Sequence, residues 1–226
     1  MKKIWMLMAA CLFLAWTLPG LADDKQKDEE TFKNATAVLD GMLTEKTVPA
    51  EVLGKADCVI VLPNVKKAGF VVGGSGGRGA MTCRTGHAFD GKWSAPAMYK
   101  VGGVSVGLQI GGSSTDYVVL VMSQKGVDAV MKGKMKMGTD ASVAAGPTGA
   151  TSASTADMYT YGRAKGAFAG VSLGGASLEA DNDANKRLYG KAVEAQELVI
   201  KNSLPTPEVG KALIGLLDTK AGKRAK

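Results

Sequence analysis

Apolar and polar residues follow two different periods along this chain. Between Gln26 and Lys46 the apolar residues recur at steps of three and four, which predicts an amphipathic helix. These apolar residues are Phe32, Ala35, Leu39, Met42 and Leu43. Pro49 suits the first turn of a second, short helix that we expect to end near Leu53. The N-terminal part of the domain is therefore predicted to be helical.

Strand patterns dominate the middle of the chain. An unbroken apolar run stops at Pro63-Asn64, as expected of a buried strand that ends in a turn, and Asp90-Gly91 is a hairpin signal. Further on, apolar residues alternate with small or polar ones, which is the period of two of a strand. The predicted strands cover residues 58–62, 67–72, 78–84, 104–111 and 117–122. Together they predict a mainly antiparallel sheet.

Glycine is unusually dense in this region. The stretch from Gly69 to Gly112 holds 13 glycines in 44 residues, yet it keeps many large apolar side chains and has Asp90 as its only acid. A flexible linker would lack those apolar residues. Glycine inside strands marks bulges, sharp bends or the close approach of a backbone or ligand. We therefore expect a tightly curving, barrel-like β-scaffold.

Both secondary-structure periods return in the second half of the chain. A helical pattern over residues 124–132 leads into Lys132, Lys134 and Lys136, which alternate with Gly133, Met135 and Met137. In strand geometry the three lysines lie on one face and the two methionines on the other. Strands are predicted at residues 158–165 and 168–178, and a helical tail from about residue 192. The fold class is thus α+β, a sheet flanked by N-terminal and C-terminal helices in a single domain over residues 23–226.

The first 22 residues have the layout of a secretory signal peptide. Lys2 and Lys3 precede an apolar run, and the small residues Gly20 and Ala22 predict cleavage after Ala22. The run is somewhat short for a membrane-spanning helix. A lipoprotein modified at Cys11 is the disfavoured alternative, because the apolar run continues well past that cysteine. We expect an exported protein of the periplasm or cell envelope.

Two cysteines, Cys58 and Cys83, remain after such cleavage, both in apolar, strand-like contexts. In an oxidising compartment they could form a disulfide across two strands. They could equally be two buried free thiols. Both states remain open, because the geometry that decides between them cannot be derived from sequence.

Three motifs resemble sites of known chemistry but lack an essential part. Residues 74–79 match the glycine pattern of a dinucleotide site, but an extended segment follows where a helix is required, so a glycine-rich turn is the simpler interpretation. A calcium-like start at residues 181–185 has Lys186 in place of the required glycine, which favours a helix cap and turn. The single histidine, His87, is too little for a zinc shell and lies near no nucleophile motif. We therefore expect no cofactor, no metal, no catalytic residues and no enzymatic activity.

The charge balance is basic but mild. The full chain carries +7, and removing Lys2 and Lys3 leaves 7 − 2 = +5, which is weak for a nucleic-acid binder. Basic side chains beside methionines suit an anionic membrane surface, although a solvated strand face is the commoner meaning of such a run. The candidate lipid-binding residues are Lys66, Lys67, Arg78, Arg84, Lys132, Lys134, Lys136, Arg163 and Lys165.

Several segments together resemble the SYLF-domain family, whose eukaryotic members bind phosphoinositides and regulate actin. They cover residues 56–79, 93–96, 103–116, 138–149 and 161–175. The chain departs from the family pattern at Ala150, where the family usually has Arg, and at Gly162, where it usually has Ser. The resemblance implies a non-enzymatic, lipid-binding α+β domain with anionic lipid as its partner. Actin is not an expected partner of an exported chain, and the alternative is a structural or protein-interaction module of the envelope with no lipid ligand.

Overall fold

The computed structural model describes residues 19–69, 72–106, 111–137, 140, 143–145, 156–165, 173 and 176–221. Its first half contains helices α1 (Pro19–Thr44) and α2 (Ala50–Leu53), strands β1 (Cys58–Gly69), β2 (Val72–Cys83), β3 (Ala97–Val106) and β4 (Gly111–Val121), and helix α3 (Gln124–Met131). Its second half contains strands β5 (Lys134–Lys136), β6 (Val143–Ala145), β7 (Met158–Lys165) and β8 (Ser177–Ala180), helices α4 (Asn182–Tyr189) and α5 (Ala195–Val199), the short 3-10 helix η1 (Glu208–Gly210) and helix α6 (Lys211–Ala221).

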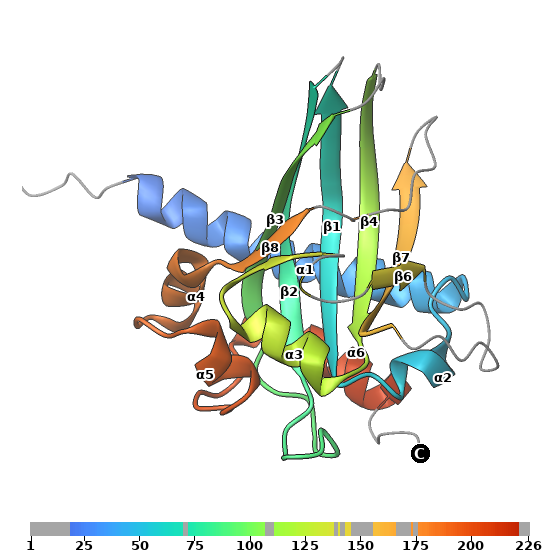
Figure 1. Cartoon of the computed structure of the whole chain (residues 1–226). Coiled ribbons are helices and arrows are strands. Elements are labelled where there is room, and N and C mark those ends of the chain that lie inside the picture. Colours follow the sequence, from blue (N-terminus) through green and yellow to red (C-terminus); the bar gives the residue numbers. More distant parts are fainter. Residues whose placement is uncertain are drawn as a thin grey trace, which may run out of the picture.

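The strands form one sheet in the order β5-β8-β3-β2-β1-β4-β7-β6. Every neighbouring pair is antiparallel except β6 and β7, which are parallel. The sheet is strongly curled, with helices on both of its faces (Figure 1). The predicted α+β class, with a mainly antiparallel, barrel-like sheet between N-terminal and C-terminal helices, is confirmed.

A separate hydrophobic core covers each face of the sheet, because successive side chains of a strand point to opposite sides. Ile60 and Leu62 of β1 pack with side chains of α3 and α5. Val59 and Val61 pack with side chains of α1, α2, α4 and α6. We call the second side the α1 face and the first side the α3 face.

Strand β1 corrects the predicted turn at Pro63-Asn64. The chain does not turn there but continues as one strand, with a shift in its pairing to β4 between Leu62 and Val65. Asn64 has a positive φ of 50°, and its backbone N–H donates to Asp116 Oδ1 at 2.9 Å. The proline therefore lies at a β-bulge, a position that tolerates it within a sheet.

The glycine-rich segment at residues 74–79 is also part of a strand, β2, and not the turn predicted for it. Gly79 shows why glycine is needed there. A Cβ at this position would lie 1.9 Å from the carbonyl oxygen of Val61 in the neighbouring strand. The close approach of two backbones thus excludes any side chain at this position.

The structure also bears on the predicted cleavage site, on the predicted helix cap at Asp181 and on the predicted strand at residues 168–178. Helix α1 begins at Pro19, so the cleavage point expected after Ala22 falls inside it, and residues 1–18 lie outside the described residues. Asp181 caps α4 by accepting a hydrogen bond from the Ala184 N–H at 3.2 Å, as expected for a helix cap and turn. Most of the strand predicted at residues 168–178 also lies outside the described residues.

The four central strands, β1 to β4, extend well beyond the helices at one end of the molecule (Figure 1). We call this part the projection, and the remainder, where helices cover the sheet, the body. No helix in the described ranges has the length and apolar character needed to cross a membrane.

Candidate anion-binding surface

Of the nine basic residues predicted to contact lipid, the three arginines are buried or paired, whereas Lys66, Lys132, Lys134 and Lys136 are exposed. Arg84 follows β2 and is fully buried. Its guanidinium carbon lies 4.3 Å from the centre of the Trp93 ring, and its nitrogens donate to the carbonyl oxygens of Ala56 and Ala221. Arg84 is therefore no longer a candidate lipid-binding residue, because its buried guanidinium is bonded inside the body and is not accessible to a lipid.

Arg78 belongs to a network that fastens α1 to the sheet. Its guanidinium donates to Asp28 of α1 at 2.7 Å and to Asp181 at 2.8 Å. Arg187 of α4 also donates to Asp28, at 2.6 Å, and the Asp28 side chain is fully buried. The hydrogen bond to Asp28 is the main cause that raises the pKa of Arg187 above its ordinary value. Arg78 is therefore neutralised by structural partners.

Arg163 of β7 makes a similar connection at the other end of α1. It pairs with the buried Asp116 of β4 at 3.1 Å and with Glu45, just beyond α1, at 2.9 Å. Burial lowers the pKa of Arg163, but its hydrogen bonds and the two acidic charges outweigh that effect and raise the pKa overall. Gly41 makes room for this guanidinium, since a Cβ there would lie 2.8 Å from Arg163 Nη1.

The lysines of β5 lie as their alternation predicts. Lys134 and Lys136 are exposed, whereas Met135 between them is fully buried against the α3 face. Lys132 is exposed as well, but it is the C-cap of α3, and Gly133 with a φ of 94° separates it from the strand. The predicted three-lysine strand face therefore consists of two lysines.

Lys66 and Lys67 lie on opposite faces because they are neighbours in a strand. Lys67 lies over the Tyr117 ring, 5.7 Å from its centre, and Tyr117 belongs to the core of the α3 face. Lys66 therefore points to the α1 face. The nine predicted residues do not form one continuous surface.

Strand pairing gathers a smaller set that the sequence analysis did not identify. Residues paired across neighbouring strands share a face of the sheet. One row of such pairs runs through seven strands, and we call it the lysine row: Lys136, Ser177, Gly102, Gly76, Lys66, Ser114 and the register position of Lys165. Met135 and Leu178 beside the row point into the core of the α3 face, so the row lies on the α1 face.

The middle of the lysine row is bare backbone. A Cβ at Gly76 would meet no atom closer than the Val101 carbonyl oxygen at 4.0 Å, and one at Gly102 none closer than the Ser75 carbonyl oxygen at 3.7 Å. At Gly74, in the next row outward, nothing lies within 4 Å. A ligand can therefore approach the backbone closely between the lysines.

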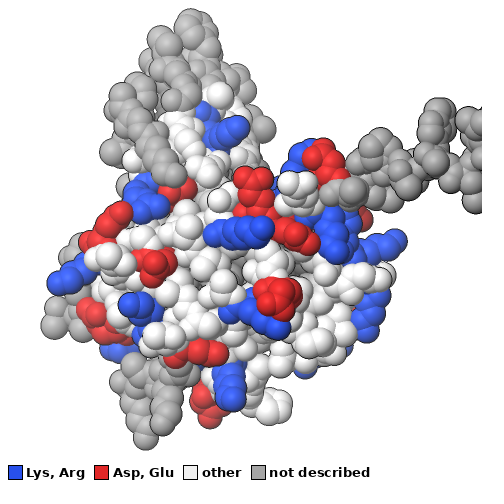
Figure 2. Space-filling view, turned by 180° about the vertical axis from the view of Figure 1, so that it is seen from behind, with Lys and Arg blue, Asp and Glu red and all other residues white. Residues whose placement is uncertain are grey.

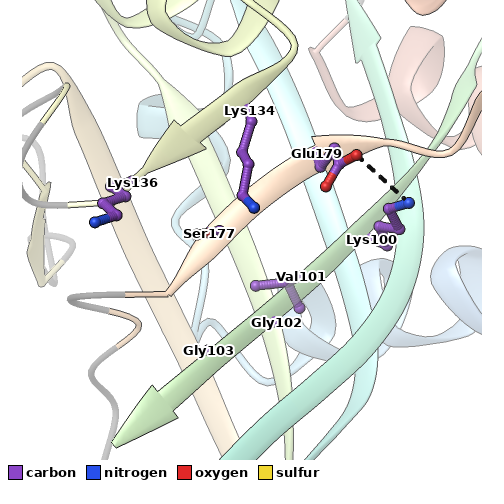
Figure 3. Close-up of a pocket in the computed structure, with 8 residues that line it drawn as sticks. All are labelled: Lys100, Val101, Gly102, Gly103, Lys134, Lys136, Ser177 and Glu179. Atoms are coloured by element: carbon purple, nitrogen blue, oxygen red, sulfur yellow. Dashed lines mark ion pairs between the residues drawn. The ribbon is translucent and has the colours of Figure 1, made fainter.

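A hollow of about 590 Å³ lies at the β5 end of the row (Figure 3). Lys134, Lys136 and Lys100 border it, together with a single acid, Glu179. Glu179 pairs with Lys100 at 3.5 Å, and Lys134 lies opposite Glu179 on its other side. Lys100 and Lys134 thus flank Glu179, and Lys136 adds a third positive charge at the border of the hollow, an arrangement that suits an anionic group.

The space-filling view of the α1 side agrees with this division (Figure 2). The projection shows a basic patch, whereas basic and acidic side chains are mixed over the body below it. The residues of β1 to β4 that form the projection, namely 64–69, 72–77, 101–106 and 111–115, contain no acid.

Cys58 and Cys83 are paired residues of β1 and β2, and their sulfurs form a disulfide. Both residues are fully buried in the core of the α3 face. Of the two states left open by the sequence, the structure has the disulfide. It lies in the body, away from the lysine row.

Three relatives show what the chain is similar to. A protein of Schizosaccharomyces pombe, "SH3 domain-containing protein PJ696.02", is 35% identical over 185 residues, which are 78% of this chain and 42% of the relative. Human "SH3 domain-containing YSC84-like protein 1" is 31% identical over 207 residues, 88% of this chain and 59% of the relative. "Protein YSC84" of Saccharomyces cerevisiae is 31% identical over 186 residues, 78% of this chain and 39% of the relative.

The chain spans about half the length of these relatives, between 39% and 59%. No solved structure matches it. The family model Ysc84, described as "Las17-binding protein actin regulator", matches residues 102–220, which include part of β3 and most of the C-terminal half. The chain therefore belongs to the Ysc84, or SYLF, family, as the resemblance of its motifs predicted.

Proposed function

We propose that this protein is a non-enzymatic component of the cell envelope that binds anionic membrane surfaces through the lysine row. The observation that carries the proposal is the hollow beside β5, where Lys100, Lys134 and Lys136 outnumber Glu179. Each basic side chain near an anionic membrane contributes about 1 kcal/mol of attraction. Two or three such lysines acting together contribute about 2–3 kcal/mol, so the binding that we propose is weak and reversible.

Several features of the surface support a membrane in preference to a compact soluble ligand. The hollow is shallow and continues into the glycine floor of the projection, where the described strand residues carry no acid. An extended, acid-free surface suits a broad anionic partner, since the field of several lysines adds over it.

The place of action follows from the expected signal peptide. Export with cleavage after Ala22 would bring the protein to the periplasm or another part of the envelope. The buried disulfide is consistent with an oxidising compartment. The name of the family model refers to Las17 binding and actin regulation. For an exported chain we propose an envelope lipid as the partner in place of actin.

The proposal is tested by sedimentation with lipid vesicles. Wild-type protein should bind vesicles that contain phosphatidylglycerol and not purely phosphatidylcholine vesicles, and binding should weaken as salt increases. The variant Lys134→Glu/Lys136→Glu should lose at least tenfold in affinity. A matched control, Lys191→Glu/Lys201→Glu, changes two exposed lysines beside α5 and makes the same change in net charge. It should bind nearly as wild type does.

The alternative function is a docking module for an envelope protein, on the same face of the sheet. It would be favoured if purified protein failed to bind either kind of vesicle but bound an envelope protein in a salt-insensitive manner. Equal loss of vesicle binding in both double variants would show that net charge alone matters, which would contradict the assignment of this surface.

A further inference from the structure

A second hollow, of about 400 Å³, lies on the α1 face between α1 and the hairpin of β1 and β2. Lys66, Gly76 and Arg78 line it from the sheet, and Lys27 and Asn34 line it from the helix. It differs from the hollow beside β5 in both residues and position. Lys66 and Gly76 nevertheless belong to the lysine row, so the two hollows are parts of one surface.

The β-bulge of β1 is what directs Lys66 into this hollow. Before the bulge, even-numbered residues such as Ile60 and Leu62 face the α3 core. After the shift, the odd-numbered Val65 faces that core, so Lys66 faces α1. If the same sequence continued as a regular strand with no bulge, Lys67 would face α1 in place of Lys66. The bulge therefore determines that Lys66, and not Lys67, lies on this surface.

Of the three basic residues that line this hollow, Lys66 is the one whose charge is available to a ligand. Arg78 is neutralised by Asp28 and Asp181. Lys27 pairs with Asp23 at 2.5 Å, and Glu30 adds one acid at the rim. Among the ion pairs of the described residues, none involves Lys66, and its side chain is exposed.

Four strand-to-strand steps separate Lys66 in β1 from Lys136 in β5. At 4.7–4.9 Å per step this is about 19 Å along the sheet. Gly76, Gly102 and Ser177 lie between the two lysines, so the small Ser177 is the one side chain of the row in this span. One anionic surface can therefore contact both hollows at once.

We propose that the second hollow binds the phosphate of a second anionic lipid, so that the protein engages the membrane at two linked points. This inference rests on the proposed membrane function. The partner is a lipid phosphate in a bilayer and not a free phosphate, because one unpaired lysine gives little affinity by itself. A contact that is weak alone becomes effective when a first contact already holds the same surface nearby.

The experiment compares three variants by titration with phosphatidylglycerol vesicles: Lys66→Gln, Lys134→Gln/Lys136→Gln, and all three substitutions together. The change at Lys66 should weaken binding about fivefold, which corresponds to about 1 kcal/mol. Lys201→Gln, an exposed lysine outside the row, is the matched control and should leave the affinity within twofold of wild type.

The outcomes separate the two proposals. If wild-type protein does not bind anionic vesicles, the proposed function and this inference both fail. If wild type binds, and Lys134→Gln/Lys136→Gln weakens binding while Lys66→Gln does not, the function stands and the second contact is refuted. Binding of soluble glycerol phosphate that depends on Lys66 at submillimolar concentration would refute the choice of a bilayer as the source.

A steric variant tests the glycine floor independently of charge. Gly76→Gln fills the open space above the strand with a neutral polar side chain, and no atom within 4 Å other than the Val101 carbonyl oxygen opposes it. It should weaken vesicle binding at least threefold without lowering the unfolding temperature. Gly215→Gln, at an exposed and equally open position in α6, should leave binding unchanged. Unchanged binding by Gly76→Gln would overturn the idea of a continuous surface.

Discussion

The arginines of the body and the lysines of the lysine row have opposite roles. In the body, Arg78, Arg84 and Arg163 contact acids, carbonyl oxygens or an aromatic ring, and they hold α1, the sheet and the C-terminal helix together. Across the lysine row, Lys66 and Lys136 are exposed over bare glycine. Arginine offers five donors in a rigid fork, which suits several fixed acceptors, whereas lysine carries a mobile point charge. The comparison indicates that the arginines stabilise the fold and that the lysines are available for a partner.

The largest effect on stability should come from Arg84→Ala. The substitution removes a fully buried guanidinium and leaves the carbonyl oxygens of Ala56 and Ala221 without this donor. We expect the free energy of unfolding to fall by about 3 kcal/mol, as measured by chemical denaturation. The fraction that still folds should bind anionic vesicles as wild type does. A loss below about 1 kcal/mol would contradict the structural role of Arg84.

A smaller loss of stability, with a gain in binding, should follow from Asp28→Asn. This carboxylate accepts hydrogen bonds from both Arg78 and Arg187. Its neutralisation should cost about 2 kcal/mol, because both arginines are partly exposed and can turn toward water. Arg78 would then have Asp181 as its acidic partner but no longer the Asp28 charge, which makes the second hollow more positive, so binding to phosphatidylglycerol vesicles should strengthen. Asp40→Asn, an exposed acid on the same helix, is the control and should change neither quantity.

High pH should weaken the body through its buried tyrosines. Burial raises the pKa of Tyr99 above its ordinary value, so in the folded protein this phenol stays protonated at a pH where it ionises in the unfolded chain. Since the unfolded state then binds fewer protons, stability falls as the pH rises above about 10. At pH 11, one unit higher, Tyr99→Phe should avoid a loss of about 1.4 kcal/mol that wild type suffers. Denaturation curves at pH 8 and pH 11 measure the difference, and an equal pH dependence in both proteins would contradict it.

The smallest effect on stability is expected at the exposed lysines in and beside the lysine row. Changing Lys66, Lys134 and Lys136 together to Gln should alter the free energy of unfolding by less than about 0.5 kcal/mol per site, since all three side chains are exposed. The same variant should lose most of its affinity for anionic vesicles. Thermal unfolding and vesicle sedimentation of one preparation test both statements. A large loss of stability would mean that these lysines belong to the fold after all.

Local sequence patterns predicted much of the fold. The helical period of residues 26–46 and the alternation of Lys134, Met135 and Lys136 both predict the observed structure, because each depends only on nearby residues. The turn predicted at Pro63-Asn64 was wrong, because a distant carboxylate, that of Asp116, accepts the Asn64 N–H and stabilises a bulge. Local sequence does not contain that partner.

The candidate site was harder to predict for the same reason. Arg78 lies 50 residues from Asp28 and 103 from Asp181, so its pairing could not be inferred from spacing. The face of Lys66 depends on the bulge, and the role of Gly76 and Gly102 depends on strand register. Lys100 lies two residues before Gly102, so the two-residue period of a strand could have predicted that both share a face of the sheet. The contribution of β5 and β8 to this surface could not be predicted, because it depends on the pairing of β3 with β8.

The central claim is that the lysine row, and not the side of the body formed by α6, meets the membrane. The most direct test attaches a polarity-sensitive fluorophore to a single introduced cysteine, at Gly76 in the row or at Gly215 in α6, and adds phosphatidylglycerol vesicles. We expect a blue-shifted, brighter emission at position 76, reversed by salt, with no change at position 215. A shift at position 215 with none at position 76 would contradict it.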